Sequence, residues 1–338
     1  MQLRLFPVML FCVGAMLANA AACLVPVFRY ALDRWPTDVF KLEAPAADLK
    51  HESSAADLRG DHGSIVNLEA LASEQTDTAK LMFPSSSSEE PKLVWTGKLS
   101  SEAYDSLTTS PARKEISKRI LHGDSAVWVI VEDQPASDNP ALAQREQTLR
   151  NIEATATFHE RPANDPSNQI GPGPELKIKF SVFRLAKNDP AEQSLIAMLA
   201  GPKGIERFAG TGSFAALVFG RGRVLGAWDL ATLDVKLIDE ASRFLLAPCS
   251  CEAKQLNPGW DLLMRVNWEA ELEAIGKGST KESPVPAMVQ PETVIYRPSA
   301  TPATAPEPAR MTTFLISSLA LGGIALAIVM WKRSQGTE

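Results

Sequence analysis

The stretch FAALVFGRGRVLGAWDLATLDVKLIDEASRFLLAPCSC, residues 214–251, decides the fold. An apolar run ends at Gly220 to Gly222, a second apolar run follows, and an amphipathic segment leads to Cys249 and Cys251. Glycines between two apolar runs are typical of a tight hairpin, because glycine readily adopts the positive φ that such turns need. The stretch therefore predicts a strand, a hairpin turn, a second strand, a helix, and two cysteines directly after that helix.

Upstream of the hairpin, the pattern predicts the rest of an α/β sheet. Ser125 to Val131 is a continuous apolar run, as in a buried central strand. Asn139-Pro140 opens a helix that extends to Thr155. Leu176 to Leu185 alternates like a strand, and Pro190 begins a helix to Leu199. The order β-α-β-α-β-β-α predicts an α/β fold with a mixed sheet and helices on both faces.

This element order is similar to that of the thioredoxin fold, whose core also ends in a tight hairpin and a helix. The resemblance covers Ser125 to Leu246 by element order and the hairpin VFGRGRVLG by motif. It implies a Cys-x-x-Cys after the first core strand and a cis-proline before the hairpin strand. This chain has Glu132-Asp133-Gln134-Pro135 and Ser213-Phe214-Ala215 at those places. We therefore expect no catalysis of the thioredoxin kind from this module.

A second resemblance involves the cysteines and carries no activity with it. The segment CLVPVFRYALDRWP, residues 23–36, and the CSC at residues 249–251 resemble a group of uncharacterised bacterial secreted proteins. Residues 23–95 are predicted to be a partly loop-rich N-terminal segment. Residues 96–275 are predicted to be the thioredoxin-like α/β domain.

The start of the N-terminal segment fits two structures. Phe28, Ala31, Leu32 and Trp35 have helical spacing, and prolines flank them. However, the triplet Val-Phe-Arg at residues 27–29 recurs at residues 182–184, inside an expected strand. The sequence therefore leaves residues 26–32 open between helix and strand.

The remaining elements are predicted from shorter signals. Val39 to Glu43 and Leu93 to Thr96 read as strands. Ala44 to Pro91 is polar and weakly patterned, which favours a loop with at most one short helix. Ser110-Pro111 is a typical helix start, and Asp261 to Ala274 is predicted to be a closing helix.

Both ends of the chain are predicted to direct it to a membrane. Residues 1–22 have a basic start, an apolar core and small residues at the end, which is typical of a cleaved signal peptide. Cleavage is expected after Ala20 or Ala22. Lipoprotein processing at Cys23 is the alternative, but Ala20 stands where a lipobox has a large aliphatic residue.

The C-terminal part is predicted to be a stalk and a membrane anchor. Residues 276–310 are rich in proline and threonine, which favours a semi-extended spacer. Residues 311–331 carry no charge and are long enough to span a bilayer. Lys332-Arg333 follows at once, so residues 332–338 are expected in the cytoplasm. These features predict a single-pass type I membrane protein whose body is extracytoplasmic.

Cys23, Cys249 and Cys251 are the candidate functional residues. One hypothesis is a disulfide that joins Cys23 to Cys249 or Cys251 and stabilises the fold. The second is thiol-disulfide exchange, in which Cys23 is catalytic at a helix N-terminus and the other two cysteines resolve it. The third is binding of a soft metal ion by the three thiolates.

Other functions are excluded or unsupported. The net charge of -6 provides no basic field for a nucleic acid. Gly220 to Gly222 leads into a strand, so it does not fit a dinucleotide-binding loop. No complete catalytic constellation is visible, and no cofactor is expected. The sequence therefore favours a non-catalytic interaction domain with an unknown protein partner.

Overall fold

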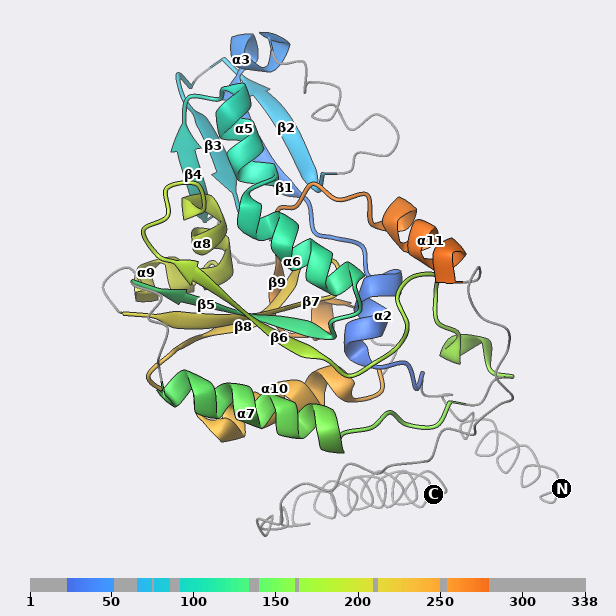
Figure 1. Ribbon diagram of the computed structural model, residues 1–338. Coiled ribbons are helices and arrows are strands. Elements are labelled where there is room, and N and C mark those ends of the chain that lie inside the picture. The colour runs from blue at the N-terminus through green and yellow to red at the C-terminus, as the bar shows by residue number, and fades with distance from the viewer. Residues whose placement is uncertain are drawn as a thin grey trace, which may run out of the picture. The chain divides into compact units, whose positions relative to one another are not determined.

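The computed structural model describes residues 23–51, 66–74, 76–85, 92–133, 140–161, 164–208, 212–249 and 254–279. These residues form a mixed α/β body with two sheets (Figure 1). The predicted signal peptide, most of the predicted stalk, the predicted span at 311–331 and the predicted tail lie outside the described residues. Within the described part, no helix is both long enough and apolar enough to cross a membrane.

The larger sheet contains the opening stretch and has the strand order β6-β5-β7-β8-β9. Its first pair, β5 and β6, is parallel, and the other pairs are antiparallel. The strands are β5 (Ala126–Glu132), β6 (Phe180–Ala186), β7 (Phe214–Phe219), β8 (Arg223–Asp229) and β9 (Trp260–Asp261). The predicted mixed sheet is thus confirmed.

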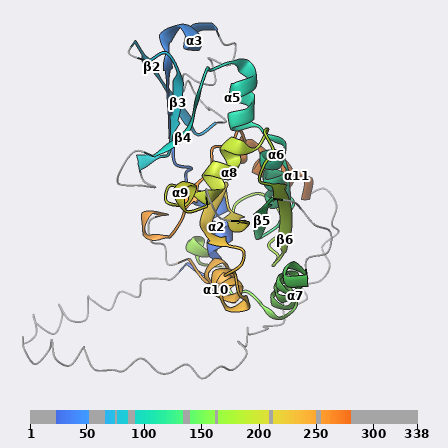
Figure 2. The same ribbon diagram turned by 90° about the vertical axis from the view of Figure 1, so that its left-hand side faces the viewer.

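Helices cover both faces of this sheet, as predicted (Figures 1 and 2). Odd-numbered residues of β5 pack with α6 (Pro111–Leu121) and α8 (Gln193–Ala200). Even-numbered residues of β5 pack with α7 (Pro140–Thr155) and α10 (Val235–Leu246). Successive side chains of a strand point to opposite faces of the sheet. A continuously apolar strand therefore contributes side chains to the hydrophobic core on each face.

The hairpin between β7 and β8 has the turn that the glycines predict. Gly220 has a φ of 56° and Gly222 a φ of 88°, a region that favours glycine. Space is also limited, because a Cβ on Gly222 would lie 2.5 Å from the sulfur of Met264. The turn therefore requires glycine both for its backbone and for its packing.

The prediction of a loop over residues 44–91 is wrong, because this region contributes to a second sheet with the order β2-β1-β3-β4. Its strands are β1 (Phe40–Pro45), β2 (Leu68–Ser73), β3 (Ala79–Met82) and β4 (Leu93–Gly97), with α3 (Ala46–His51) after β1. β2 is an edge strand with one buried residue, Leu68, and β3 has four residues. β2 therefore gives no alternating pattern, and the alternation of β3 is too short to be recognised in the sequence.

The two sheets share one of the cores. Phe40 and Leu81 of the smaller sheet belong to the same cluster as Val129 of β5. Helix α5 (Ser101–Thr108) contributes Tyr104 and Leu107 to that cluster. The described residues between 23 and 95 are therefore part of the same packed body as the described residues that follow them.

Several predicted boundaries need revision. Residues 27–34 form helix α2 (Val27–Arg34), which settles the open choice in favour of a helix. The closing helix α11 (Trp268–Ser279) begins later than predicted, because residues 260–261 form β9 and the buried residues 262–264 follow it. Short helices complete the described elements: α9 (Gly204–Phe208), η2 (Pro166–Asn168) and η3 (Lys254–Leu256).

Candidate functional site

The structure brings the start of the described chain to the end of helix α10. Pro26 and Pro248 form an isolated antiparallel bridge. The amide of Cys249 donates to the carbonyl of Val25 at 2.9 Å, and the amide of Val27 donates to that of Ala247 at 3.0 Å. Both Cys23 and Cys249 lie in the core between α2, α7 and α10. Cys251 lies outside the described residues.

A third segment covers Cys23. Its thiol donates to the carbonyl of Ser167 at 3.1 Å, and the amide of Leu24 donates to the side chain of Asn168 at 2.7 Å. Cys23 is 0% exposed and Cys249 is 1% exposed. Neither thiol is therefore presented to solvent, where a reactive cysteine would need to be.

Arg161 lies near enough to Cys23 to respond to its charge. Burial lowers the pKa of Arg161, the nearby Arg29 lowers it further, and Cys23 acts in the opposite direction. In the described part of the chain, no group of three metal-ligating side chains is gathered at this place or elsewhere.

The end of β5, where the thioredoxin resemblance implies a Cys-x-x-Cys, holds an ion pair. Glu132 is the last residue of β5, and its Oε1 accepts from Nε of Arg184 at 2.5 Å. The pKa of Arg184 is raised because it hydrogen-bonds Glu132. No cis peptide bond occurs in the described ranges, including Ser213 and Phe214. The described residues at this end of the sheet therefore link β5 to β6 through an ion pair, and none of them is a cysteine.

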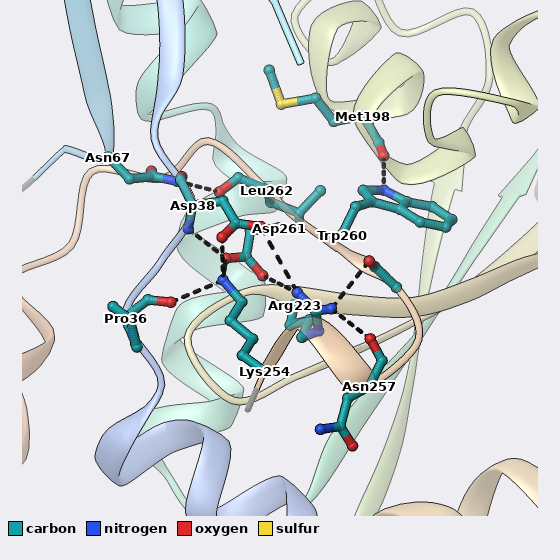
Figure 3. Close-up of polar contacts among 11 residues, drawn as sticks. Pro36, Asp38, Asn67, Met198, Arg223, Lys254, Asn257, Trp260, Asp261 and Leu262 are labelled. Atoms are coloured by element: carbon teal, nitrogen blue, oxygen red, sulfur yellow. Dashed lines mark hydrogen bonds and ion pairs between the residues drawn. The ribbon is translucent and has the colours of Figure 1, made fainter. Parts of the chain in front are cut away.

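A cluster of buried charges that the sequence analysis missed lies at the junction of the two sheets (Figure 3). Arg223 begins β8 and lies opposite Asp261 of β9, with 3.1 Å between Nη1 and Oδ1. Lys254 of η3 bonds both Asp261 and, at 2.8 Å, Asp38, which precedes β1. Arg223 is 5%, Lys254 8% and Asp261 2% exposed. Two cations and two carboxylates thus join three stretches that are distant in sequence: the residues before β1, the start of β8, and residues 254–261.

Further hydrogen bonds hold this cluster in place. The amide of Asp38 donates to Asp261 at 2.6 Å, and Lys254 also donates to the carbonyl of Pro36 at 2.8 Å. Asn67 donates to the carbonyls of Asp38 and Leu262 at 2.8 and 3.0 Å. Buried charges are stable only when paired and hydrogen-bonded in this way. The cluster therefore fixes the approach to β1 against β8 and β9.

A small cleft opens beside the cluster, and the space in it that the centre of a water-sized sphere can reach is about 10 Å³. It is lined by the end of α2 and the following residues, the hairpin, η3 and β9: Ala31, Trp35, Pro36, Thr37, Arg221, Arg223, Lys254 and Asp261. The guanidinium of Arg223 lies over the ring of Trp35, 5.7 Å from its centroid. A space of this size holds about one water molecule, far less than the roughly 300–1,000 Å³ of pockets that bind drug-sized ligands.

One feature of the sequence could have indicated this cleft: the two arginines at the glycine turn. Arg221 and Arg223 belong to the glycine turn, which the sequence analysis assigned to a hairpin and excluded from phosphate loops of the dinucleotide type. That assignment holds, but the arginines themselves face a cleft. Asp38, Lys254 and Asp261 carry no motif, and only the fold brings them together.

Arg113 is a buried cation outside the cluster, and its surroundings indicate a structural role. Its guanidinium donates to the carbonyls of Leu263 and Ser106 and to the hydroxyl of Ser110, at 2.8 to 3.1 Å. Burial lowers its pKa to about 10, and the charge of Glu192 opposes that shift. Arg113 thus ties α5, α6 and the segment after β9 together.

Comparisons with known proteins identify no relative. No protein-family model matches the chain, and neither a curated protein nor a solved structure matches it. The functional argument therefore rests on the site itself.

Proposed function

We propose that this chain is a non-catalytic, membrane-tethered extracytoplasmic domain of thioredoxin-like topology that acts by binding a protein partner. Two features support the topology. The elements from β5 to α10 follow the β-α-β-α-β-β-α order, with helices α8 and α9 together between β6 and β7. The first two strands are parallel and the last two form an antiparallel hairpin. Residues 311–331 provide the membrane anchor. The spacer is residues 280–310, because residues 276–279 of the predicted stalk belong to helix α11.

The observation that carries the proposal is the burial of Cys23 and Cys249. Thiol exchange requires a thiolate that a partner disulfide can reach. Cys23 and Cys249, the two cysteines that the structure describes, are instead enclosed in the core, and the end of β5 is occupied by the Glu132–Arg184 pair. A domain that keeps the topology and encloses these two thiols is better suited to binding than to thiol exchange.

We assign Cys23 a structural disulfide, and the register favours one of its two candidate partners. The bridge between Pro26 and Pro248 sets Val25 opposite Cys249. Cys23 is two residues beyond Val25, and Cys251 is two residues beyond Cys249. Continued pairing in this register favours Cys251 over Cys249 as the partner of Cys23. Such a bond would stabilise the fold by about 2–5 kcal/mol.

Disulfide mapping of the full chain, purified without reductant, tests this assignment. Digestion and mass spectrometry are expected to find a peptide that joins Cys23 to Cys251. A Cys251→Ser variant should lose the link, and the matched Cys249→Ser variant should keep it. Rapid alkylation of Cys23 in the native protein would contradict the structural role and with it the non-catalytic proposal.

Thiol exchange is the second candidate, and the proximity of Arg161 to Cys23 is the observation that favours it. A neighbouring guanidinium stabilises a thiolate. If this function is correct, native protein should form a mixed disulfide with glutathione at Cys23, and Arg161→Met should slow that reaction. Soft-metal binding would require all three cysteines, and a silver or zinc titration should then be abolished by Cys23→Ser.

A further inference from the structure

Lys254 and Asp261 combine close contact with burial. The ammonium of Lys254 contacts Oδ2 of Asp261, and the two residues are 8% and 2% exposed (Figure 3). Holding an amine against a carboxyl group in one orientation makes a reaction between them effectively unimolecular. Their burial also keeps out most of the water that would compete for the carboxyl carbon. The pair therefore places a nucleophile beside an acceptor.

A second carboxylate can carry the protons of such a reaction. Oδ1 of Asp38 lies 2.8 Å from Nζ of Lys254, and the carbonyl of Pro36 accepts from the same ammonium at 2.8 Å. An ammonium attacks a carbon only after it has lost a proton. A carboxylate within hydrogen-bond distance can accept that proton and later return it to a leaving oxygen. Asp38 is placed for both transfers.

Both oxygens of Asp261 have further hydrogen-bond donors. Nη1 of Arg223 lies 3.1 Å from Oδ1, and the amide of Asp38 donates to Oδ2 at 2.6 Å. Donors in these places stabilise the negative charge that develops on the oxygens when the carboxyl carbon is attacked. The guanidinium of Arg223 is itself held, because its Nη2 donates to the carbonyls of Asn257 and Gly259. The donors around Asp261 therefore need no rearrangement during a reaction.

We propose that Lys254 and Asp261 form an intramolecular isopeptide bond, with Asp38 as the proton carrier and Arg223 as a donor to the developing oxyanion. Nζ of Lys254 gives a proton to Asp38 and attacks Cγ of Asp261, so that a C–N bond forms. One C–O bond of Asp261 then breaks. Its oxygen leaves as water with two protons that came from the ammonium and passed through Asp38. An ammonium and a carboxylate thus become an amide and one water molecule, without any further reactant.

The loss of buried charge favours this bond. The reaction removes one buried cation and one buried carboxylate, and both are costly to keep out of water. The charges that remain still balance, because Arg223 lies 4.0 Å from Asp38. The cleft that Lys254 and Asp261 line has room for about one water molecule, which is the other product.

The Lys179–Asp124 pair provides an internal control, because it has the contact without the other features. Nζ of Lys179 lies 2.6 Å from Oδ1 of Asp124, whose side chain is 1% exposed. The Lys179 side chain is 49% exposed, however, and in the described part of the chain no group other than this ammonium donates to the Asp124 carboxylate. Close contact alone is not expected to produce a bond, so Lys179 should remain an unmodified lysine.

Trypsin digestion and mass spectrometry of the full chain, purified in detergent and then reduced, alkylated and denatured, test the bond. Residues 244–265 form a tryptic segment that contains Lys254, after which trypsin cleaves only if the lysine is unmodified. We expect an uncleaved 244–265 peptide that is lighter than its sequence by one water molecule, with Lys254 joined to Asp261 in its fragment spectrum. Cleavage after Lys179 should be normal. Complete cleavage after Lys254, or a 244–265 peptide of full mass, would overturn the proposal.

Variants test the roles within the reaction. Asp38→Asn keeps the shape of the side chain but cannot carry the protons, so the cross-linked fraction measured soon after synthesis should fall about tenfold or more. Asp133→Asn, at a side chain that is 72% exposed, is the matched control and should cross-link as the wild type does. Asp261→Asn should still react and lose ammonia in place of water. Unchanged cross-linking in folded Asp38→Asn would contradict the role of Asp38, and the wild-type peptide decides the bond itself if that variant does not fold.

Discussion

The triplet Val-Phe-Arg occurs twice, once as residues 27–29 in helix α2 and once as residues 182–184 in strand β6. In the helix all three residues are buried, and in the strand all three are partly exposed. Pro26 precedes the helical copy and Asp33 follows it at a distance of one turn. The strand copy is paired in parallel with β5. The surrounding residues, rather than the triplet itself, therefore decide whether it forms a helix or a strand.

The two arginines show the same difference. Arg29 pairs with Asp33 at 2.9 Å and donates to the carbonyls of Gly171, Pro172 and Pro174, so it holds a loop against α2. Among the described residues, Arg184 forms an ion pair within 4 Å only with Glu132. The helical copy therefore organises a buried contact between distant segments, and the strand copy secures one neighbouring strand.

Arg29→Met should give the largest effect. It leaves the Asp33 carboxylate, whose side chain is 3% exposed, without its cation, and it removes the donors to the loop. We expect a loss of about 3–5 kcal/mol in the free energy of unfolding, measured with urea. Arg34→Met, at an exposed position on the same helix, should cost about 0.5 kcal/mol or less. Equal losses of unfolding free energy in the two variants would contradict the role of Arg29 in holding the loop against α2.

Arg184→Met should cost less, about 1–2 kcal/mol. The Glu132 side chain is 6% exposed and loses its partner, but Arg184 is 24% exposed, so water partly replaces it. Adding Glu132→Gln should restore part of the loss, because the unpaired buried charge is then removed. Strictly additive losses in this double-mutant cycle would show that the pair is not coupled.

Pro26→Ala should have a still smaller effect, about 0.4–1 kcal/mol. Proline restricts the unfolded chain at the residue before α2, and at the bridge to Pro248 its missing amide is not needed for the ladder. Circular dichroism and urea unfolding should show a native-like helix content with a lower midpoint. Complete loss of the helix would mean that Pro26 alone decides between helix and strand.

A pH titration should give the smallest effect, at the strand copy. Arg119 donates to the carbonyl of Val182, lies over the ring of Phe183 and bonds Glu115. That bond lowers the pKa of Glu115 below its ordinary value of 4.5. The pair thus stabilises the folded state above pH 4.5, and this contribution is lost as the pH falls through the lower, folded pKa. The difference in unfolding free energy between wild type and Glu115→Gln should shrink in that window, and a constant difference would contradict the mechanism.

Sequence predicted the elements with strong local signals. The run before Gly220 and the run at residues 126–132 are buried on both sides, so their apolar character alone marked them as central strands. In the second sheet, β1 and β4 were predicted as strands, but β2 and β3 were not. Both of these strands pair with β1, and that pairing defines them more than their own sequence does. Tertiary pairing of this kind leaves little trace in local pattern.

Of the two candidate sites, one was suggested by the sequence and the other was found only in the structure. An approach of the C-terminal cysteines to Cys23 was a hypothesis from three rare residues, and the backbone contact between Val25 and Cys249 is consistent with it. The charge cluster was invisible because Asp38, Arg223 and Asp261 come from segments far apart in sequence. No spacing rule connects them before the chain has folded.

The bridge between Pro26 and Pro248 has a consequence for the timing of folding. Helix α2 is the first helix of the described chain, yet it packs against α10 and β7, which are among the last elements to be synthesised. A growing chain therefore carries the apolar face of α2 without its partners until residues 235–249 have emerged. Contacts of such long sequence separation form slowly. The core around α2 should thus form only after residue 249 has been synthesised.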